Sequence, residues 1–195
     1  PAALANSTAA PPFDRTDSMK GIEQMATGIG KDIGRGGAVA AAFWAMMALV
    51  GTPANATTVL GTDSIYVMDK ELNPVSILKL PDGSGPRHIL FKNSTLAYCV
   101  NELSSTVSVL QYENGRFNYI RSFSTLPESF DGANTASTLR LHKNRLYVSN
   151  RGHDSIAVFE IRDEGLNMLL TIPSGGKCPR EFNIVGDFIL SGNEL

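Results

Sequence analysis

Short apolar runs, broken at regular intervals by turn residues, fill the chain from residue 57 onward. β-Branched and aromatic residues predominate in these runs, which is typical of partly buried strands. Gly, Asn, Asp and Pro separate the runs, and no convincing helical period occurs in 57–195. The pattern predicts an all-β fold, and its clearest strands are SIYVMD (64–69), LAYCV (96–100), TVSVLQY (106–112), RLYVS (145–149), SIAVFEI (155–161) and DFILS (187–191).

Three stretches of this region are similar to one another. GTDSIYVMDKELNPVSIL, ELSSTVSVLQYENGRFNYI and GHDSIAVFEIRDEGLNMLL each predict a polar turn, a strand, a second turn and a second strand. Ile65, Val107 and Ile156 align at intervals of 42 and 49 residues. A period of ~40–50 residues with four short strands per unit is the signature of a β-propeller. A Greek-key sandwich would contain similar strands without this period, so we favour the propeller.

Four polar clusters follow from the predicted topology. Strands alternate in direction in a four-stranded blade, so the connection into the innermost strand and the connection between the second and third strands emerge at the same end. GPRH (85–88) and CPRE (178–181) precede innermost strands, whereas NELSS (101–105) and NRGHD (150–154) link second to third strands. We therefore expect all four clusters on one face, around the central channel.

Residues 1–56 differ in composition and are rich in Ala, Gly and Met. The apolar run 38–50 is 13 residues long, too short for a helix to cross a hydrocarbon core of ~30 Å. Basic residues precede this run and Ala-Asn-Ala (54–56) follows it, as in a secretory signal. A buried or unpacked helix is an equal alternative.

The expected organisation is thus an unrelated, partly helical or disordered segment 1–56 and a partial propeller 57–195. Cleavage after Ala56 would leave a chain that begins in mid-repeat, which argues against a working signal. No membrane association is expected unless the run 38–50 acts as a signal or anchor.

Composition excludes several classes of protein. Among the 195 residues 43% are hydrophobic, as in a globular chain, and the net charge of −2 gives no reason to expect nucleic acid as a partner. The only two cysteines, Cys99 and Cys178, exclude a disulfide framework and leave one bridge open. Cys–His metal spacing is absent, so neither a metal nor a cofactor is predicted.

In combination, GSGPRHILF, AYCVNELSSTVSVL, FSTLPESFDGANTAS, LYVSNRGHDSIAVFEI and GGKCPREFNIV resemble the lactonase family of seven-bladed β-propellers. That family includes the bacterial propeller-type 6-phosphogluconolactonase and the fungal carboxy-muconate lactonizing enzyme. The resemblance covers about residues 59–195, which is about three four-stranded blades of seven. It implies an incomplete and inactive fragment, whose open blade edges favour self-association.

The resemblance also implies a function and a location. It points to hydrolysis of a small anionic sugar lactone, as in the pentose phosphate pathway, and to a cytoplasmic protein. If residues 25–56 act as a signal peptide, the protein is instead secreted or periplasmic. A muconate-lactonizing enzyme and a non-catalytic propeller that binds a protein or peptide remain alternatives.

Lactone hydrolysis needs a base near neutrality, donors for the developing oxyanion and fixed positive charge for an anionic substrate. His88 fits the base because imidazole titrates near neutral pH, and Glu102 would orient His88 or pair with an arginine. Guanidinium binds carboxylate or phosphate in bidentate fashion, and asparagine donates hydrogen bonds without changing charge. The predicted catalytic residues are therefore His88, Glu102 and Arg151, and the predicted substrate-binding residues are Arg87, Asn101, Asn134, Asn150 and Arg180.

Each assignment has a structural alternative. The arginines would form salt bridges between blades, and Glu102 would be a solvated loop charge. His153 and Asp154 fit a structural turn pair better than a site. Glu181 follows Pro-Arg where His88 does so in the earlier blade, which makes it a weaker candidate for the site.

Overall fold

The computed structural model describes residues 55–195, and the predicted signal-like run 38–50 lies outside these residues. The described elements are β1 (Asn55–Val59), a 3-10 helix η1 (Leu60–Thr62), β2 (Ser64–Met68), β3 (Pro74–Lys79), β4 (Pro86–Phe91), β5 (Leu96–Asn101), β6 (Thr106–Glu113), β7 (Arg116–Ser124), β8 (Thr135–His142), β9 (Arg145–Arg151), β10 (Ser155–Arg162), β11 (Gly165–Pro173), β12 (Pro179–Val185) and β13 (Phe188–Asn193). No helix in this part of the chain is long and apolar enough to cross a membrane.

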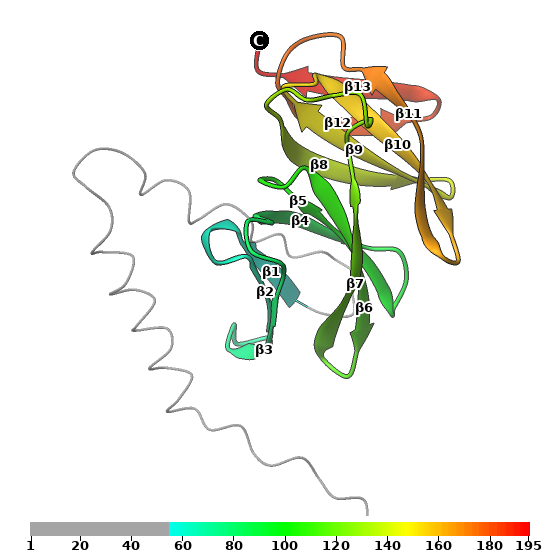
Figure 1. Cartoon of the computed structure of the whole chain (residues 1–195). Helices are drawn as coiled ribbons and strands as arrows, with labels where there is room; N and C mark the ends of the chain where they lie inside the picture. Colours follow the sequence, from blue (N-terminus) through cyan, green and yellow to red (C-terminus); the bar gives the residue numbers. More distant parts are fainter. Residues whose placement is uncertain (1–54) are drawn as a thin grey trace, which may run out of the picture. The chain divides into compact units, whose positions relative to one another are not determined.

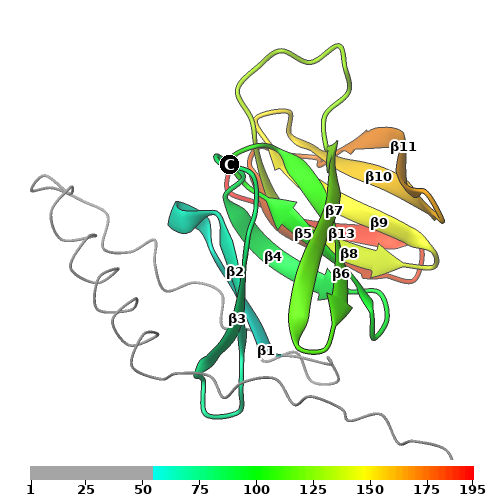
Figure 2. The same cartoon turned by 60° about the horizontal axis from the view of Figure 1, so that its bottom comes forward.

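The strands form antiparallel meanders, which confirms the predicted all-β partial propeller (Figure 1). Two blades are complete, β4-β5-β6-β7 and β8-β9-β10-β11. A three-stranded sheet β1-β2-β3 precedes them and the two-stranded sheet β12-β13 follows them. The innermost strands β4, β8 and β12 contact one another in sequence order, so successive blades meet along the inner strands (Figure 2).

The repeat is visible in the backbone as well as in the sequence. Strands β2, β6 and β10 occupy the same place in the repeat, next to the last strand of each sheet. Each carries a β-bulge at the same position, at Val67/Met68, Val109/Leu110 and Val158/Phe159. A residue with left-handed backbone conformation also recurs in the turn before each of these strands, at Asp63, Ser105 and Asp154, with φ of 51°, 51° and 52°. Both sets of positions keep the spacing of 42 and 49 residues. The three stretches aligned in the sequence therefore also occupy equivalent positions in the structure.

Two of these left-handed turns tie each blade to the next. The Asp63 carboxylate accepts hydrogen bonds from the backbone N–H groups of Gly83 (2.9 Å) and Gly85 (2.6 Å), just before β4. Two blades later, Asp154 Oδ1 accepts a hydrogen bond from the N–H of Cys178 (2.8 Å), just before β12. The third-strand turn therefore fixes the start of an innermost strand, where the polar clusters lie.

Two hydrophobic clusters fill the spaces between the blades. Tyr98 and Val100 pack with residues of β8–β11, whereas Ala97 and Cys99 face the cluster that includes β2 residues. The sheet β4–β7 is thus buried on both faces, which explains why LAYCV is continuously apolar rather than alternating. Burial raises the pKa of the Cys99 thiol to about 12, and Cys99 and Cys178 are both free thiols.

The sheet β12-β13 has one covered and one uncovered face. Phe182 is 2% exposed, but Val185, Phe188 and Leu190 are exposed by 54%, 73% and 60%. These three side chains belong to the kind of face that packs against a neighbouring blade. Within residues 55–195 this sheet thus presents an exposed apolar face, and the self-association expected of open blades stays a prediction.

Candidate active site

Backbone hydrogen bonds bring the polar clusters of successive blades together. The N–H of Glu102 donates to the carbonyl of Gly85 (2.7 Å), and the N–H of Leu103 donates to that of Ser84 (3.2 Å). The carbonyl of Glu102 accepts from the N–H of Ala136 (3.1 Å), which belongs to the innermost strand of the next blade. Residue 102 therefore lies between the innermost strands β4 and β8.

Glu102 pairs with two arginines. Its Oε2 lies 3.0 Å from Arg87 Nε, and its Oε1 lies 2.8 Å from Arg151 Nη2. The side chains of Arg87, Glu102 and Arg151 are 22%, 21% and 14% exposed, so water screens these charges less than at an open surface. Of the two predicted roles of Glu102, the structure shows the arginine pair and no hydrogen bond to His88.

Two guanidinium groups share one carboxylate, so this cluster of Arg87, Glu102 and Arg151, here called the rim cluster, carries a surplus of positive charge. Burial lowers the pKa of Arg87, Glu102 acts in the opposite direction, and Arg151 and Arg180 lower it again. Because Arg151 and Arg180 each lower the pKa of Arg87, both guanidinium groups lie close enough to repel that of Arg87. A bound anion would relieve this repulsion.

Arg151 has one buried donor without a partner. Its Nε makes no hydrogen bond or ion pair within residues 55–195, whereas its buried Nη2 has the ion pair with Glu102 Oε1. Leaving buried donors unpaired costs about 1–3 kcal/mol or more. Nε–H and an Nη2–H project from the same edge of a guanidinium, and this edge matches two oxygens of one carboxylate or phosphate. The Arg151 edge is thus suited to bind an oxyanion.

Arg180 lies farther from the rim cluster. Its side chain is 58% exposed, and its Nη1 lies 3.7 Å from Glu194 Oε2. The backbone carbonyl of Arg180 accepts a hydrogen bond from Ser137 Oγ (2.7 Å) and so joins β12 to β8. The structure places Arg180 beside the site, where it adds positive charge.

Two predicted substrate-binding asparagines have their side-chain groups occupied by protein partners. Asn150 Oδ1 accepts from Thr125 Oγ1 (2.7 Å) and from Asn134 Nδ2 (3.3 Å), and Asn150 Nδ2 donates to the carbonyl of Thr125 (2.8 Å). Asn134 Nδ2 also donates to Ser105 Oγ (2.9 Å), and Asn134 Oδ1 accepts from the N–H of His153 (3.0 Å). These bonds connect blades, and the geometry places both asparagines in the scaffold.

Asn101 is also a scaffold residue. It is fully buried, and its Nδ2 donates to Thr106 Oγ1 (2.9 Å) and Ser108 Oγ (2.8 Å) of the neighbouring strand. Its Oδ1 has no hydrogen-bond partner among the described residues. The structure thus shows hydrogen bonds to protein groups for all three asparagines, and their binding of substrate stays a prediction.

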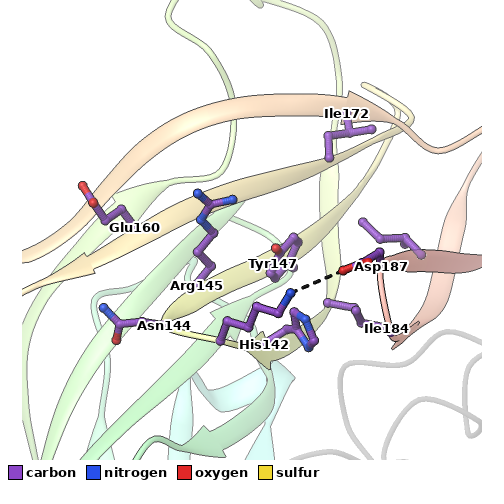
Figure 3. Close-up of a pocket in the computed structure, with 11 residues that line it drawn as sticks. His142, Asn144, Arg145, Tyr147, Glu160, Ile172, Ile184 and Asp187 are labelled. Atoms are coloured by element: carbon purple, nitrogen blue, oxygen red, sulfur yellow. Dashed lines mark hydrogen bonds and ion pairs between the residues drawn. The ribbon is translucent and has the colours of Figure 1, made fainter.

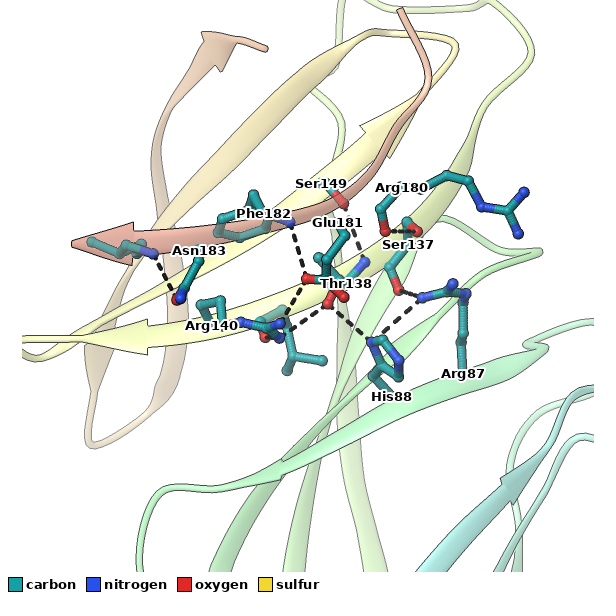
Figure 4. Close-up of polar contacts among 12 residues, drawn as sticks. Arg87, His88, Ser137, Thr138, Arg140, Ser149, Arg180, Glu181, Phe182 and Asn183 are labelled. Carbon is teal, nitrogen blue, oxygen red and sulfur yellow. Dashed lines mark hydrogen bonds and ion pairs between the residues drawn. The ribbon is translucent and has the colours of Figure 1, made fainter. Parts of the chain in front are cut away.

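His88 lies on β4, next to Arg87 of the rim cluster. Its Nδ1 is 3.0 Å from Thr138 Oγ1 and 3.4 Å from Arg87 Nη1 (Figure 4). Burial, followed by the positive charge of Arg87, lowers the pKa of His88 to about 4. The expectation of an imidazole that titrates near neutrality is not met, because a charged ring here would be desolvated and next to a cation.

Strand β8 contributes residues that the sequence patterns did not single out. The carbonyl of Ser137 accepts from Arg87 Nη1 (2.6 Å), and Thr138 Oγ1 accepts from Arg140 Nη1 (3.1 Å). Arg140 Nη2 in turn donates to Glu181 Oε1 (2.6 Å). β8 lacks the Pro-Arg signature of β4 and β12. The one feature of the sequence that could have indicated this strand is its position, one blade after GPRH.

The turn residues His153 and Asp154 hold the backbone. His153 Nδ1 lies 2.6 Å from Ser155 Oγ, and its ring packs edge-on against Phe130 with centroids 4.7 Å apart. Asp154 makes the contact to Cys178 described above. Arg151 is the residue of NRGHD that reaches the rim cluster, which matches the division expected from the sequence.

A separate cavity of about 600 Å³ lies at the other ends of β8 and β9 (Figure 3). Its lining includes His142, Lys143, Arg145 and Tyr147, and Lys143 Nζ is 3.3 Å from Asp187 Oδ1. The cavity contains no residue predicted for the site, and Arg145 and Arg151 stand at opposite ends of the same strand. No group of three His, Cys, Asp or Glu side chains suited to hold a metal ion occurs within residues 55–195.

Comparison with known proteins identifies the fold and its relatives. Residues 50–195 match the family described as lactonase, 7-bladed beta-propeller. An uncharacterized protein of Staphylococcus saprophyticus is 45% identical over 133 residues, covering 64% of this chain and 39% of its own. Uncharacterized proteins of Staphylococcus aureus are 43–44% identical over 149 residues, covering 71% of this chain and 44% of theirs.

Solved structures give the same result. A protein from Lactobacillus plantarum has a TM-score of 0.68 at 33% identity, covering 73% of this chain and 46% of its own. A periplasmic gluconolactonase of Pseudomonas aeruginosa has a TM-score of 0.65 at 30% identity, with coverage of 71% and 43%. A putative 6-phosphogluconolactonase from Bacteroides fragilis has a TM-score of 0.61 at 26% identity, with coverage of 71% and 44%. The chain spans less than half the length of these relatives.

Proposed function

Because the chain belongs to the lactonase family of seven-bladed β-propellers, we propose that its rim cluster is part of a site that hydrolyses a sugar lactone bearing an anionic group. The observation that carries the proposal is the surplus positive charge of the rim cluster, in which Arg87 and Arg151 share the one carboxylate of Glu102. Structural neighbours described as a gluconolactonase and as putative 6-phosphogluconolactonases support the reaction class. The sugar and the pathway belong to the proposal.

The proposed reaction opens the ester ring by addition of water. The water oxygen bonds to the carbonyl carbon, the C=O electron pair moves onto the carbonyl oxygen, and Glu102 accepts the proton released from water. The electron pair on the carbonyl oxygen then re-forms the C=O bond as the C–O bond of the ring breaks, and the ring oxygen takes the proton back from Glu102 to give a hydroxy acid. The two ion pairs leave further lone pairs on the Glu102 carboxylate that can accept the proton.

The positive surplus of the rim cluster favours a phosphorylated or carboxylated lactone over a neutral one. A carboxylate or phosphate on the Arg151 edge would pair with Nε, which has no acceptor among the described residues, and fix the substrate in register. The same surplus would stabilise the oxyanion that forms at the carbonyl oxygen. Arg180, half-exposed at the margin, would attract the anion by charge rather than by a fixed contact.

Hydrolysis of glucono-δ-lactone and of its 6-phosphate, measured by proton release and corrected for the spontaneous reaction, tests the proposal on the full chain. In contrast to the inactive fragment that the sequence resemblance implies, the proposal predicts hydrolysis by the wild-type chain, faster with the phosphorylated lactone. Arg151→Met, which keeps the length of the side chain and removes the donors, should lower kcat/KM by roughly 100-fold or more.

Arg145→Met is the matched control, because Arg145 lies on the same strand at the end away from the rim cluster. It should leave hydrolysis unchanged. Equal rates for wild type and Arg151→Met, or no rate above the spontaneous reaction with wild type, would contradict the proposal.

A further inference from the structure

The two ring nitrogens of His88 have different surroundings. Nδ1 lies within 3.0 Å of Thr138 Oγ1 and 3.4 Å of Arg87 Nη1, whereas Nε2 makes no hydrogen bond within residues 55–195. A guanidinium only donates hydrogen bonds, so a proton on Nδ1 would point at the N–H of Arg87. The compatible arrangement has a lone pair on Nδ1 and the proton on Nε2.

Thr138 is held in the orientation that this arrangement needs. Its side chain is fully buried, and its Oγ1 already accepts from Arg140 Nη1 (3.1 Å). The threonine hydroxyl hydrogen is thereby free to donate to His88 Nδ1. Arg140 cannot turn away readily, because Nη1 also donates to the carbonyl of Leu139 (2.8 Å) and Nη2 donates to Glu181 Oε1 (2.6 Å). Figure 4 shows the continuous chain of contacts from Glu181 to His88.

The charges around the ring also favour its neutral form. Arg87 on β4 and Arg140 on β8 lower the pKa of the His88 ring, while Glu181 and Glu102 raise it. Burial adds to the effect of the arginines, and the pKa of His88 is about 4. A ring that is neutral throughout the neutral range is a weak proton acceptor but still a hydrogen-bond donor through Nε2.

We propose that His88 acts as a neutral hydrogen-bond donor through Nε2, and that Thr138 and Arg140 are positioning residues that hold this tautomer. The inference rests on the proposed lactonase function. As the water oxygen adds to the carbonyl carbon and the C=O electron pair moves onto oxygen, Nε2–H donates to that oxygen and keeps its proton. The proton from water goes to Glu102, so His88 is not the base.

Nitrogen NMR on the full chain tests the tautomer without any substrate. The chain has three histidines, and His88→Gln identifies the His88 signals by their loss. We expect Nε2 protonated and Nδ1 unprotonated at neutral pH. Thr138→Val, which removes the hydroxyl at nearly constant shape, should give a mixture of tautomers, and Thr138→Ser should restore the single form. A wild-type ring protonated on Nδ1 would overturn the inference, whatever the variants do.

Hydrolysis by two His88 variants separates a donor from a base. Gln places an amide N–H near the position of Nε2 but cannot accept the proton of water, whereas Leu offers neither function. With the 6-phosphate of glucono-δ-lactone we expect His88→Gln to keep kcat within roughly 10-fold of wild type and His88→Leu to lose roughly 100-fold. Equal losses in both variants would contradict the donor role and favour a base.

The two sets of measurements keep this inference separate from the proposed function. If wild type does not hydrolyse the lactone, the proposed function fails together with the donor role, and the NMR result alone decides whether Thr138 and Arg140 hold the tautomer. If wild type hydrolyses the lactone with Nδ1 protonated, the function stands and the inference fails. Arg140→Met gives an independent test of the chain of contacts, because it should also mix the tautomers.

Discussion

Replacement of Glu102 by glutamine tests the electrostatic account of the rim cluster. Glu102 is the carboxylate shared by Arg87 and Arg151, whose side chains are only 22% and 14% exposed. Removal of one partner from a buried ion pair costs about 3–5 kcal/mol. The remaining exposure allows some screening by water and salt, so we expect a loss of about 2–3 kcal/mol in the free energy of unfolding.

Urea unfolding of the full chain at low ionic strength measures this loss. Glu194→Gln is the matched control, because Glu194 is 52% exposed and 3.7 Å from Arg180, and it should cost less than about 0.5 kcal/mol. Inorganic phosphate should restore part of the stability of Glu102→Gln and have a smaller effect on wild type, since an anion that binds only the folded state stabilises it. A Glu102→Gln variant as stable as wild type, or equal losses in both variants, would refute the reasoning.

Three further predictions rest on other contacts. The pKa of His88 is about 4 in the folded chain and ordinarily 6.5, so the stability that its neutral form contributes is complete above pH 6.5 and is lost as the pH falls toward 4. Over this range the free energy of unfolding should fall by up to about 3 kcal/mol more in wild type than in His88→Gln. Parallel pH profiles of the two proteins would contradict this. Phe188→Asp should lower self-association in sedimentation velocity, because Phe188 is 73% exposed on the uncovered blade face, and an unchanged association constant would exclude this face. Gly152→Ala should lower the free energy of unfolding in urea by about 2–4 kcal/mol, because φ is 120° and the new Cβ would meet the backbone carbonyl oxygen of Ala133. Gly61→Ala is the control and should be nearly neutral, because no atom lies within 4 Å of its new Cβ. Similar losses in both variants would argue against a steric clash at Gly152.

The fold was largely predictable from the sequence, because strand period and turn residues are local signals. The six strands named from the apolar pattern all occur, and the recurring bulges and left-handed residues keep the spacing of the aligned stretches. Strands β1 and β8 were the exceptions, because Asn55–Val59 begins inside the segment 1–56 expected to be unrelated, and TASTLRLH is polar and lacks the Pro-Arg signature of the other innermost strands.

The site was predictable only in part. The meander topology correctly brings Arg87, Glu102 and Arg151 together, since alternating strands carry these loops to one end of the blades. Which groups pair across the blades depends on packing between strands distant in sequence. The sequence could therefore not decide whether Glu102 contacts His88 or an arginine, nor show that Asn134 and Asn150 bond to each other.

The most direct test of the central claim is a crystal structure of the full chain with 6-phosphogluconate, the product of the proposed reaction. The account predicts that a carboxylate or phosphate oxygen of this ligand lies within hydrogen-bond distance of both Nε and Nη2 of Arg151. Binding instead in the cavity beside Lys143 and Arg145, with the Arg151 edge unoccupied, would contradict it.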